Sequence, residues 1–138
     1  MQWHPPFSKS FGTILIYWPT SPLTNRDLKE IVNLANSRYF RNHLKKVTIR
    51  WARNKEIQAR ALAVTRSAHG KIPRGERKFL ILLSKDMRKM SGTAIMTVIH
   101  ELVHVEQWDE VTDKTQHGRK FQKRMKQLAA RGAFSGLW

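Results

Sequence analysis

Residues 100–104 read HELVH, a pattern in which a glutamate follows the first of two histidines that are four positions apart. On an α-helix, positions i and i+4 lie one turn apart on the same face, so His100 and His104 can reach one metal ion. Glu101 is turned about 100° around the helix axis, where it can touch a water on that metal without binding the metal itself. The spacing predicts a zinc hydrolase site in which zinc acidifies the water and Glu101 acts as general base.

A third metal ligand must be a histidine or a carboxylate, because the sequence has no cysteine. A metzincin site would need Gly and His three and six residues after His104, where this chain has Gln107 and Glu110. No acidic residue follows Asp113, and the only later histidine is His117. We therefore expect His117 to complete a three-histidine zinc site with one open coordination position.

Other interpretations of these residues stay open. The pair in the motif can be incidental histidines of an amphipathic helix, and His117 can be a surface residue at a helix start. A purely structural zinc would usually take four protein ligands and would leave Glu101 without a role. Four nearby carboxylates are candidates for a hydrogen bond to the far nitrogen of a ligand histidine: Glu106, Asp109, Glu110 and Asp113.

The apolar spacing predicts the elements that must position this site. We expect a strand at 13–18, a helix from 24 or 25 to about 40, strands at 47–51, 61–67 and 79–83, a helix over 91–108 and a last helix over 117–130. Helices at both ends of a group of short strands favour an α+β fold. With 138 residues, the chain is expected to form one domain over 11–138 after an N-terminal arm at 1–10, with a small, mostly antiparallel sheet.

Two segments resemble the SprT-like (Spartan-type) zinc metalloprotease domain. They are VIHELVHVEQW at 98–108 and QHGRKFQKRM at 116–125, and ILLSKDM at 81–87 resembles the I-x-L-S segment of that family. The resemblance covers about residues 80–126 and, more loosely, the predicted helix at 24–40. The HExxH half occurs in many zincins, whereas the HG-x-x-F half thirteen residues after the second motif histidine points to this family.

The resemblance implies a zincin-like domain over 11–138 with an HExxH helix and a C-terminal helix. It implies that His100, His104 and His117 bind one Zn²⁺ per chain and that Glu101 is the catalytic base. Members of the family cleave proteins, and some cleave proteins crosslinked to DNA, with DNA as the activator. Many members also carry a cysteine-rich zinc ribbon or a long tail. Because this sequence has no cysteine, we expect a minimal form without the ribbon, to which the family's regulation does not transfer.

The charge of the chain predicts a polyanionic partner. Lys and Arg number 26 against 10 Asp and Glu, and runs at 38–55 and 119–131 contain no acid. Such runs are typical of phosphate-binding surfaces, so we expect sequence-independent binding to DNA or RNA that weakens with salt. Trp51 lies in the first run, where it can stack on a base or belong to the core. The candidate contacts are Arg50, Trp51, Arg53, Lys120, Lys123 and Arg124.

Neither a membrane span nor an export signal is evident in the sequence. The longest apolar run, Phe11–Trp18, has eight residues, whereas a helix that spans a bilayer needs about 18 or more. The first ten residues lack the basic start and long apolar stretch of a signal peptide. We expect a monomer that stays in the cytoplasm or on the nucleoid and binds no membrane.

The leading hypothesis is a zinc-dependent endopeptidase that acts on proteins at or near DNA. Its protein substrate would pair with an exposed strand beside the metal, either 61–67 or 79–84, and the loop at 70–75 would cover the cleft. The alternative is a basic nucleic-acid-binding protein without catalysis, whose zinc site is structural or vestigial. A hydrolase of another substrate class also stays open, because zinc-activated water is not intrinsically selective.

Overall fold

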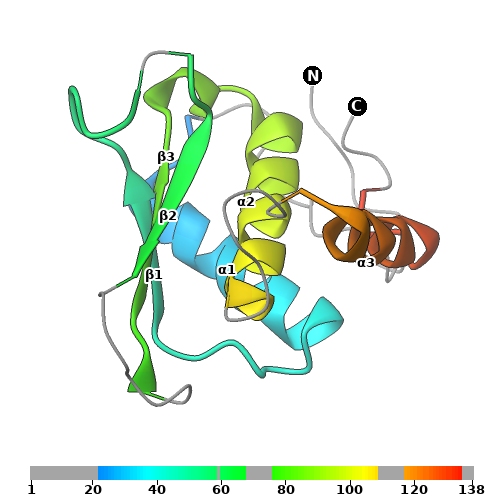
Figure 1. Cartoon of the computed structure of the whole chain (residues 1–138). Coiled ribbons are helices and arrows are strands. Elements are labelled where there is room, and N and C mark those ends of the chain that lie inside the picture. Colours follow the sequence, from blue (N-terminus) through cyan, green and yellow to red (C-terminus); the bar gives the residue numbers. More distant parts are fainter. Residues whose placement is uncertain (1–21, 59, 68–75, 109–116, 135–138) are drawn as a thin grey trace.

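The computed structural model describes residues 22–58, 60–67, 76–108 and 117–134. The expected arm at 1–10, the strand at 13–18 and the loop at 70–75 lie outside these ranges. The described elements, in chain order, are α1 (Asn25–Tyr39), β1 (Val47–Trp51), β2 (Ala63–Ser67), β3 (Phe79–Leu83), the short 3₁₀ helix η3 (Lys85–Met87), α2 (Ser91–Glu106) and α3 (Arg119–Ala130). This α+β arrangement confirms the predicted fold class (Figure 1).

Helix α1 begins where the sequence predicted because Thr24 and Asp27 form a capping box. The Asp27 amide donates to Thr24 Oγ1 at 3.1 Å, and the Thr24 amide donates to Asp27 Oδ2 at 2.8 Å. These bonds satisfy two backbone donors that a helix start would otherwise leave open. The helix then buries the face that carries Leu28, Ile31, Val32, Ala35 and Tyr39.

The sheet is small and mixed. Its strand order is β1-β3-β2, in which β1 runs parallel to β3 and β2 runs antiparallel to β3. A mostly antiparallel sheet was predicted from the sequence, but β3, the last strand in the chain, inserts between β1 and β2 and runs parallel to β1, so one of the two pairings is parallel. Central β3 has partners on both edges, whereas within the described residues the outer edge of β2 has none.

Helix α2 occupies the middle of the molecule (Figure 1). It contacts β2 and β3 on one side, α1 on another and α3 on the side away from the sheet. An element enclosed in this way needs apolar residues around most of its circumference, and α2 buries ten of its sixteen residues. Two of those ten, Glu101 and His104, are ionisable, which marks them for a role other than packing. None of the helices within the described ranges is long and apolar enough to span a bilayer.

Candidate metal centre

The candidate metal centre is formed by the middle of α2 and the residues that lead into α3. His100 and His104 lie on α2, and His117 stands two residues before the first residue of α3. Gly118 is the N-cap of α3 and has an extended backbone, so the chain turns into the helix directly after His117. The packing of α3 on α2 brings His117 to the pair on α2, although thirteen residues separate it from His104.

The three imidazoles meet at their Nε2 atoms. The Nε2–Nε2 distances are 3.1 Å between His100 and His104, 3.2 Å between His100 and His117, and 3.0 Å between His104 and His117. A tetrahedral zinc with Zn–N bonds of about 2.0–2.1 Å requires its nitrogen ligands to be about 3.3 Å apart. The triangle therefore has nearly the spacing that one zinc ion requires.

The chemistry of the donors also fits a cation. A neutral imidazole nitrogen carries either a hydrogen or a lone pair, so at least two of the three Nε2 atoms are of the same kind. At least one of the three short contacts therefore cannot be a hydrogen bond. A cation removes this conflict, because all three nitrogens can then present lone pairs to it. Among the histidines and carboxylates of the described residues, His100, His104 and His117 form the group whose ligand atoms are close enough to share an ion.

The surroundings keep two of the ligands neutral. Burial lowers the pKa of His100 to about 4, with a further contribution from the charge of His117. Burial likewise lowers the pKa of His104 to about 4, with contributions from both other histidines. An imidazole that stays unprotonated keeps the lone pair that a metal requires.

Glu101 lies beside the triangle and is almost fully buried, with 6% of its surface exposed. Its Oε2 is 3.7 Å from His100 Nε2 and 4.0 Å from His104 Nε2, so it borders the metal position without being part of the triangle. Burial raises the pKa of Glu101, and a hydrogen bond from Thr65 lowers it by a smaller amount. A carboxylate in such a place is a stronger base than one on the surface.

Sequence reasoning missed Thr65. Its hydroxyl, on β2, donates to Glu101 Oε1 at 2.9 Å, which leaves Oε2 on the side of the histidines. Thr65 precedes Glu101 by 36 residues, and a threonine in a predicted strand carries no signal of this contact. The position becomes apparent only from the way β2 packs against α2.

Phe121 supports all three imidazoles. Its ring stacks on His104 with centroids 4.6 Å apart and meets His100 and His117 edge-on at 4.8 and 5.0 Å. Phe121 lies in the first turn of α3 and is 3% exposed. It thus links the orientation of the rings to the packing of α3. This contact is a physical reason for a phenylalanine at the last position of the HG-x-x-F motif.

We predict that Phe121→Ala weakens zinc binding by about 10- to 100-fold, because the rings lose the surface that orients them. A competitive titration with a chelating dye measures this. Leu128→Ala is the matched control, since Leu128 is also fully buried on α3 and lies seven residues, about two turns, beyond Phe121. It should lower the melting temperature and leave the zinc affinity of the folded protein unchanged. Equal zinc affinities in the two variants would contradict the orienting role.

Comparison with known families agrees with this site. The sequence model of the SprT-like family matches residues 28–135, which is most of the chain. The chain belongs to the SprT-like family. No individual curated protein matched it in sequence. In this SprT-like domain all three histidines, Glu101 and Thr65 lie within the matched range.

The six residues predicted to contact nucleic acid differ in their environment: one is buried, three are exposed and two have structural partners. Trp51 is 7% exposed, and its indole N–H donates to the Leu23 carbonyl at 2.9 Å, so it is a core residue without a face for a base. The stacking role predicted for Trp51 is therefore wrong, because the end of β1 packs on the start of α1. Arg53, Lys120 and Lys123 are exposed.

The two remaining arginines have structural partners. Arg50 makes a two-pronged ion pair with Glu56, with both N–O distances 2.7 Å. Arg124 donates to Glu106 Oε1 at 2.9 Å and to the Tyr39 carbonyl at 2.6 Å, and so joins α3 to the ends of α2 and α1. Glu106 thus contacts Arg124, and the other three carboxylates considered as partners of the histidines lie outside the described residues.

The ion pair between Arg50 and Glu56 predicts a pH dependence of stability. Hydrogen bonds from the Arg50 side chain and the Arg53 amide lower the pKa of Glu56 from 4.5 to about 2. A lowered pKa in the folded state stabilises the protein above pH 4.5, and this contribution is lost as the pH falls from 4.5 to about 2. Glu56→Gln should therefore lower the melting temperature near pH 7, and the two curves should converge as the pH falls towards about 2. Glu30→Gln, which removes an exposed pair with Arg26, should change little at any pH. A Glu56 effect that does not vary with pH would contradict the assignment.

Proposed function

We propose that this SprT-like domain is a zinc-dependent endopeptidase that cleaves proteins associated with DNA. The observation that supports the reaction is the position of Glu101, with Oε1 held by Thr65 and Oε2 next to the three ligand nitrogens. A site that only bound zinc for stability would gain nothing from a buried carboxylate in this position, since burial of a charge has a cost.

His100, His104 and His117 would hold the ion. When bound, zinc supplies Lewis-acid polarisation of a peptide carbonyl and lowers the pKa of water. Glu101 Oε2 is the atom that takes the proton from the attacking water, because Oε1 is occupied by the Thr65 hydroxyl. The same oxygen then gives the proton to the leaving amine, which a carboxylate with a raised pKa does more readily.

The substrate backbone would pair with β2. Of the two strands considered from the sequence, β3 lies between β1 and β2 and has no free edge. The outer edge of β2 has no partner within the described residues, and β2 carries Thr65 beside Glu101. A peptide added to this edge would pass the metal centre with its carbonyl groups in a fixed register.

The test of the reaction uses the zinc-loaded full chain and an unfolded protein such as casein. We expect cleavage that stops when a chelator removes the metal and returns when zinc is added. Because relatives respond to DNA, the assay runs with and without a single-stranded oligonucleotide. Zinc-replete protein that cleaves nothing in either condition would favour the alternative, a nucleic-acid-binding protein with a non-catalytic zinc.

The exposed side of α3 is the surface that we propose for DNA. Arg119, Lys123 and Lys126 are exposed at positions i, i+4 and i+7, which lie on one helix face. The basic run at 38–55 starts next to the C-terminal end of α3, since Arg131 donates to the Arg38 carbonyl at 2.7 Å and its guanidinium lies over the Tyr39 ring.

The DNA surface is tested with a charge-matched pair of double variants in a gel-shift assay. Lys123→Glu with Lys126→Glu should weaken oligonucleotide binding and reduce the slope of log K against log salt by about 2. Lys85→Glu with Lys89→Glu makes the same charge change on η3 and the segment before α2, where it should have a smaller effect. Equal losses in the two double variants would contradict a specific role for α3.

A further inference from the structure

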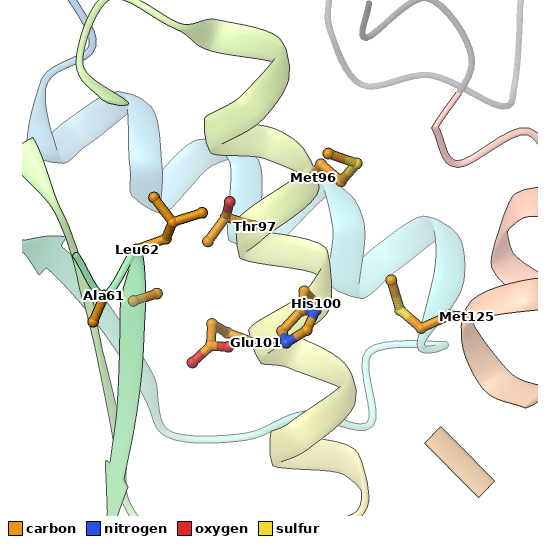
Figure 2. A pocket seen from close by; sticks show the side chains of 8 residues that line it. Ala61, Leu62, Met96, Thr97, His100, Glu101 and Met125 are labelled. Atoms are coloured by element: carbon orange, nitrogen blue, oxygen red, sulfur yellow. Dashed lines mark ion pairs between the residues drawn. The ribbon is translucent and has the colours of Figure 1, made fainter. Parts of the chain in front are cut away.

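A second cavity lies away from the candidate metal centre. The first, of about 460 Å³, is lined by 61–63, by α2 and by Met125 of α3, as Figure 2 shows. It belongs to the site already described, because His100 and Glu101 form part of its wall. The second, of about 360 Å³, lies between α1 and β1, two elements that carry none of the residues of the metal centre. We call it the α1–β1 groove.

The α1–β1 groove borders the outer edge of β1. This strand pairs with β3 on one side, and its other side has no partner strand within the described residues. The Lys46 carbonyl and the Ala52 amide both bond to β3. Because successive residues of a strand direct their backbone groups to alternate edges, the amides and carbonyls of Val47 and Ile49 point outwards. Both of these residues line the groove.

Asn25 shows that an outward amide of this edge bonds to a group across the groove. The amide of Trp51, the next outward residue of β1, donates to Asn25 Oδ1 at 2.9 Å. Asn25 is the first residue of α1 and also lines the groove. A side chain of α1 thus satisfies the last outward amide, and an incoming peptide backbone can satisfy the amides of Val47 and Ile49 in the same way.

Two cations stand beside the open edge. Arg26 and Lys29 are exposed on α1 and line the groove, and none of the residues that line it is acidic. Arg26 pairs with Glu30, but the pair is 3.8 Å long and the arginine side chain is 88% exposed, so another carboxylate can replace Glu30. A second copy of β1 would bring the same two cations against these, whereas an acidic strand is complementary to them.

The remaining lining favours a peptide over a nucleic acid. Val32 of α1, which is 5% exposed, and the half-buried Val47 and Ile49 form an apolar part of the groove. No aromatic residue lines it, so an unpaired base would have no ring to stack on. An open strand edge instead offers donors and acceptors at the spacing of a peptide backbone.

We propose that the α1–β1 groove docks an extended acidic segment of another protein, which adds to β1 as a further strand. Backbone hydrogen bonds to Val47 and Ile49 supply the affinity. Every second side chain of the added strand faces α1, so Arg26 and Lys29 select acidic residues at alternate positions. This docking site does not depend on the proposed peptidase function, because none of its residues belongs to the metal centre.

Fluorescence anisotropy of a labelled octapeptide, in which Glu and Thr alternate, tests the docking on the full chain. Two N-methylated versions of this peptide, with the methyl groups on the Glu or on the Thr nitrogens, keep its charge and block opposite edges of the strand. One version should bind at least about 10-fold more weakly than the parent, and the other should bind like it, because only one edge bonds to β1. Equal affinities of the two versions would indicate purely electrostatic attachment and would overturn strand addition.

A charge-matched pair of double variants locates the bound peptide. Arg26→Glu with Lys29→Glu should weaken binding by about 10-fold and should improve binding of a peptide in which Lys replaces Glu. Lys85→Glu with Lys89→Glu makes the same charge change at exposed residues outside the groove and should have a smaller effect. Equal losses in the two double variants would overturn the proposed site.

A competition experiment distinguishes a peptide from a nucleic acid as the occupant. A single-stranded oligonucleotide should leave the peptide bound to the α1–β1 groove at physiological salt. Displacement of the peptide, together with loss of oligonucleotide binding in the variant with Arg26→Glu and Lys29→Glu, would identify the groove as a phosphate-binding surface and overturn the proposal. The assay measures binding and not cleavage, so its outcome is separate from that of the peptidase tests.

Discussion

Glu101→Gln is expected to reduce kcat/KM for peptide cleavage by about 10²- to 10⁴-fold while one zinc per chain stays bound. Glutamine has the shape of glutamate and can still accept the hydrogen bond from Thr65, so the fold and the histidine triangle should persist. It cannot take a proton from water at Oε2, and for this reason only the reaction is lost. Peptide kinetics together with zinc analysis of the same samples check both parts of the prediction.

Two further variants show whether the loss belongs to this carboxylate. Glu30→Gln makes the same chemical change on the exposed side of α1 and should leave turnover and zinc content unchanged. Thr65→Val removes the hydroxyl that holds Oε1 and should lower kcat by less than Glu101→Gln does. Unchanged cleavage in Glu101→Gln would reject the residue as base. Loss of zinc in the same variant would instead identify Glu101 as a ligand.

His117→Ala is expected to weaken zinc binding by at least about 100-fold and to abolish cleavage, since it removes one corner of the ligand triangle. Added zinc should raise the melting temperature of the wild type. When zinc is at 100 times its Kd, its binding increases the free energy of unfolding by about 2.7 kcal/mol. The variant should lose this response, because His100 and His104 alone leave the ion with too few protein ligands. Inductively coupled plasma analysis and thermal melts with and without zinc measure the two effects.

His43→Ala is the matched control for the third ligand. His43 is exposed in the segment after α1 and is not part of the cluster that could hold an ion. The control should bind zinc like the wild type and show the same rise in melting temperature. If His117→Ala behaves in the same way, the ion is held elsewhere and the three-histidine site is wrong.

The local features of the protein could be predicted from the sequence, because each depends on residues close together in the chain. The i, i+4 spacing places His100 and His104 on one face of a helix, and the capping box at Thr24 starts α1. His117 could be named as the third ligand because the chain offers so few alternatives after Asp113. The family was also readable, because its motifs are contiguous segments, and the family match confirms it.

The relations between distant segments could not be predicted from the sequence, because they depend on how the folded chain packs. The sheet order places β3 between its partners and leaves β2 at an edge, which hydrophobic spacing does not encode. The same packing brings Thr65 to Glu101, which lies 36 residues later in the chain. It also buries Trp51 in the core, where the residue cannot stack on a base. The cavity beside the histidines joins 61–63, α2 and α3, so no single segment reveals it. Such features follow from long-range packing of side chains, whereas a local pattern reports only the face and period of its own element.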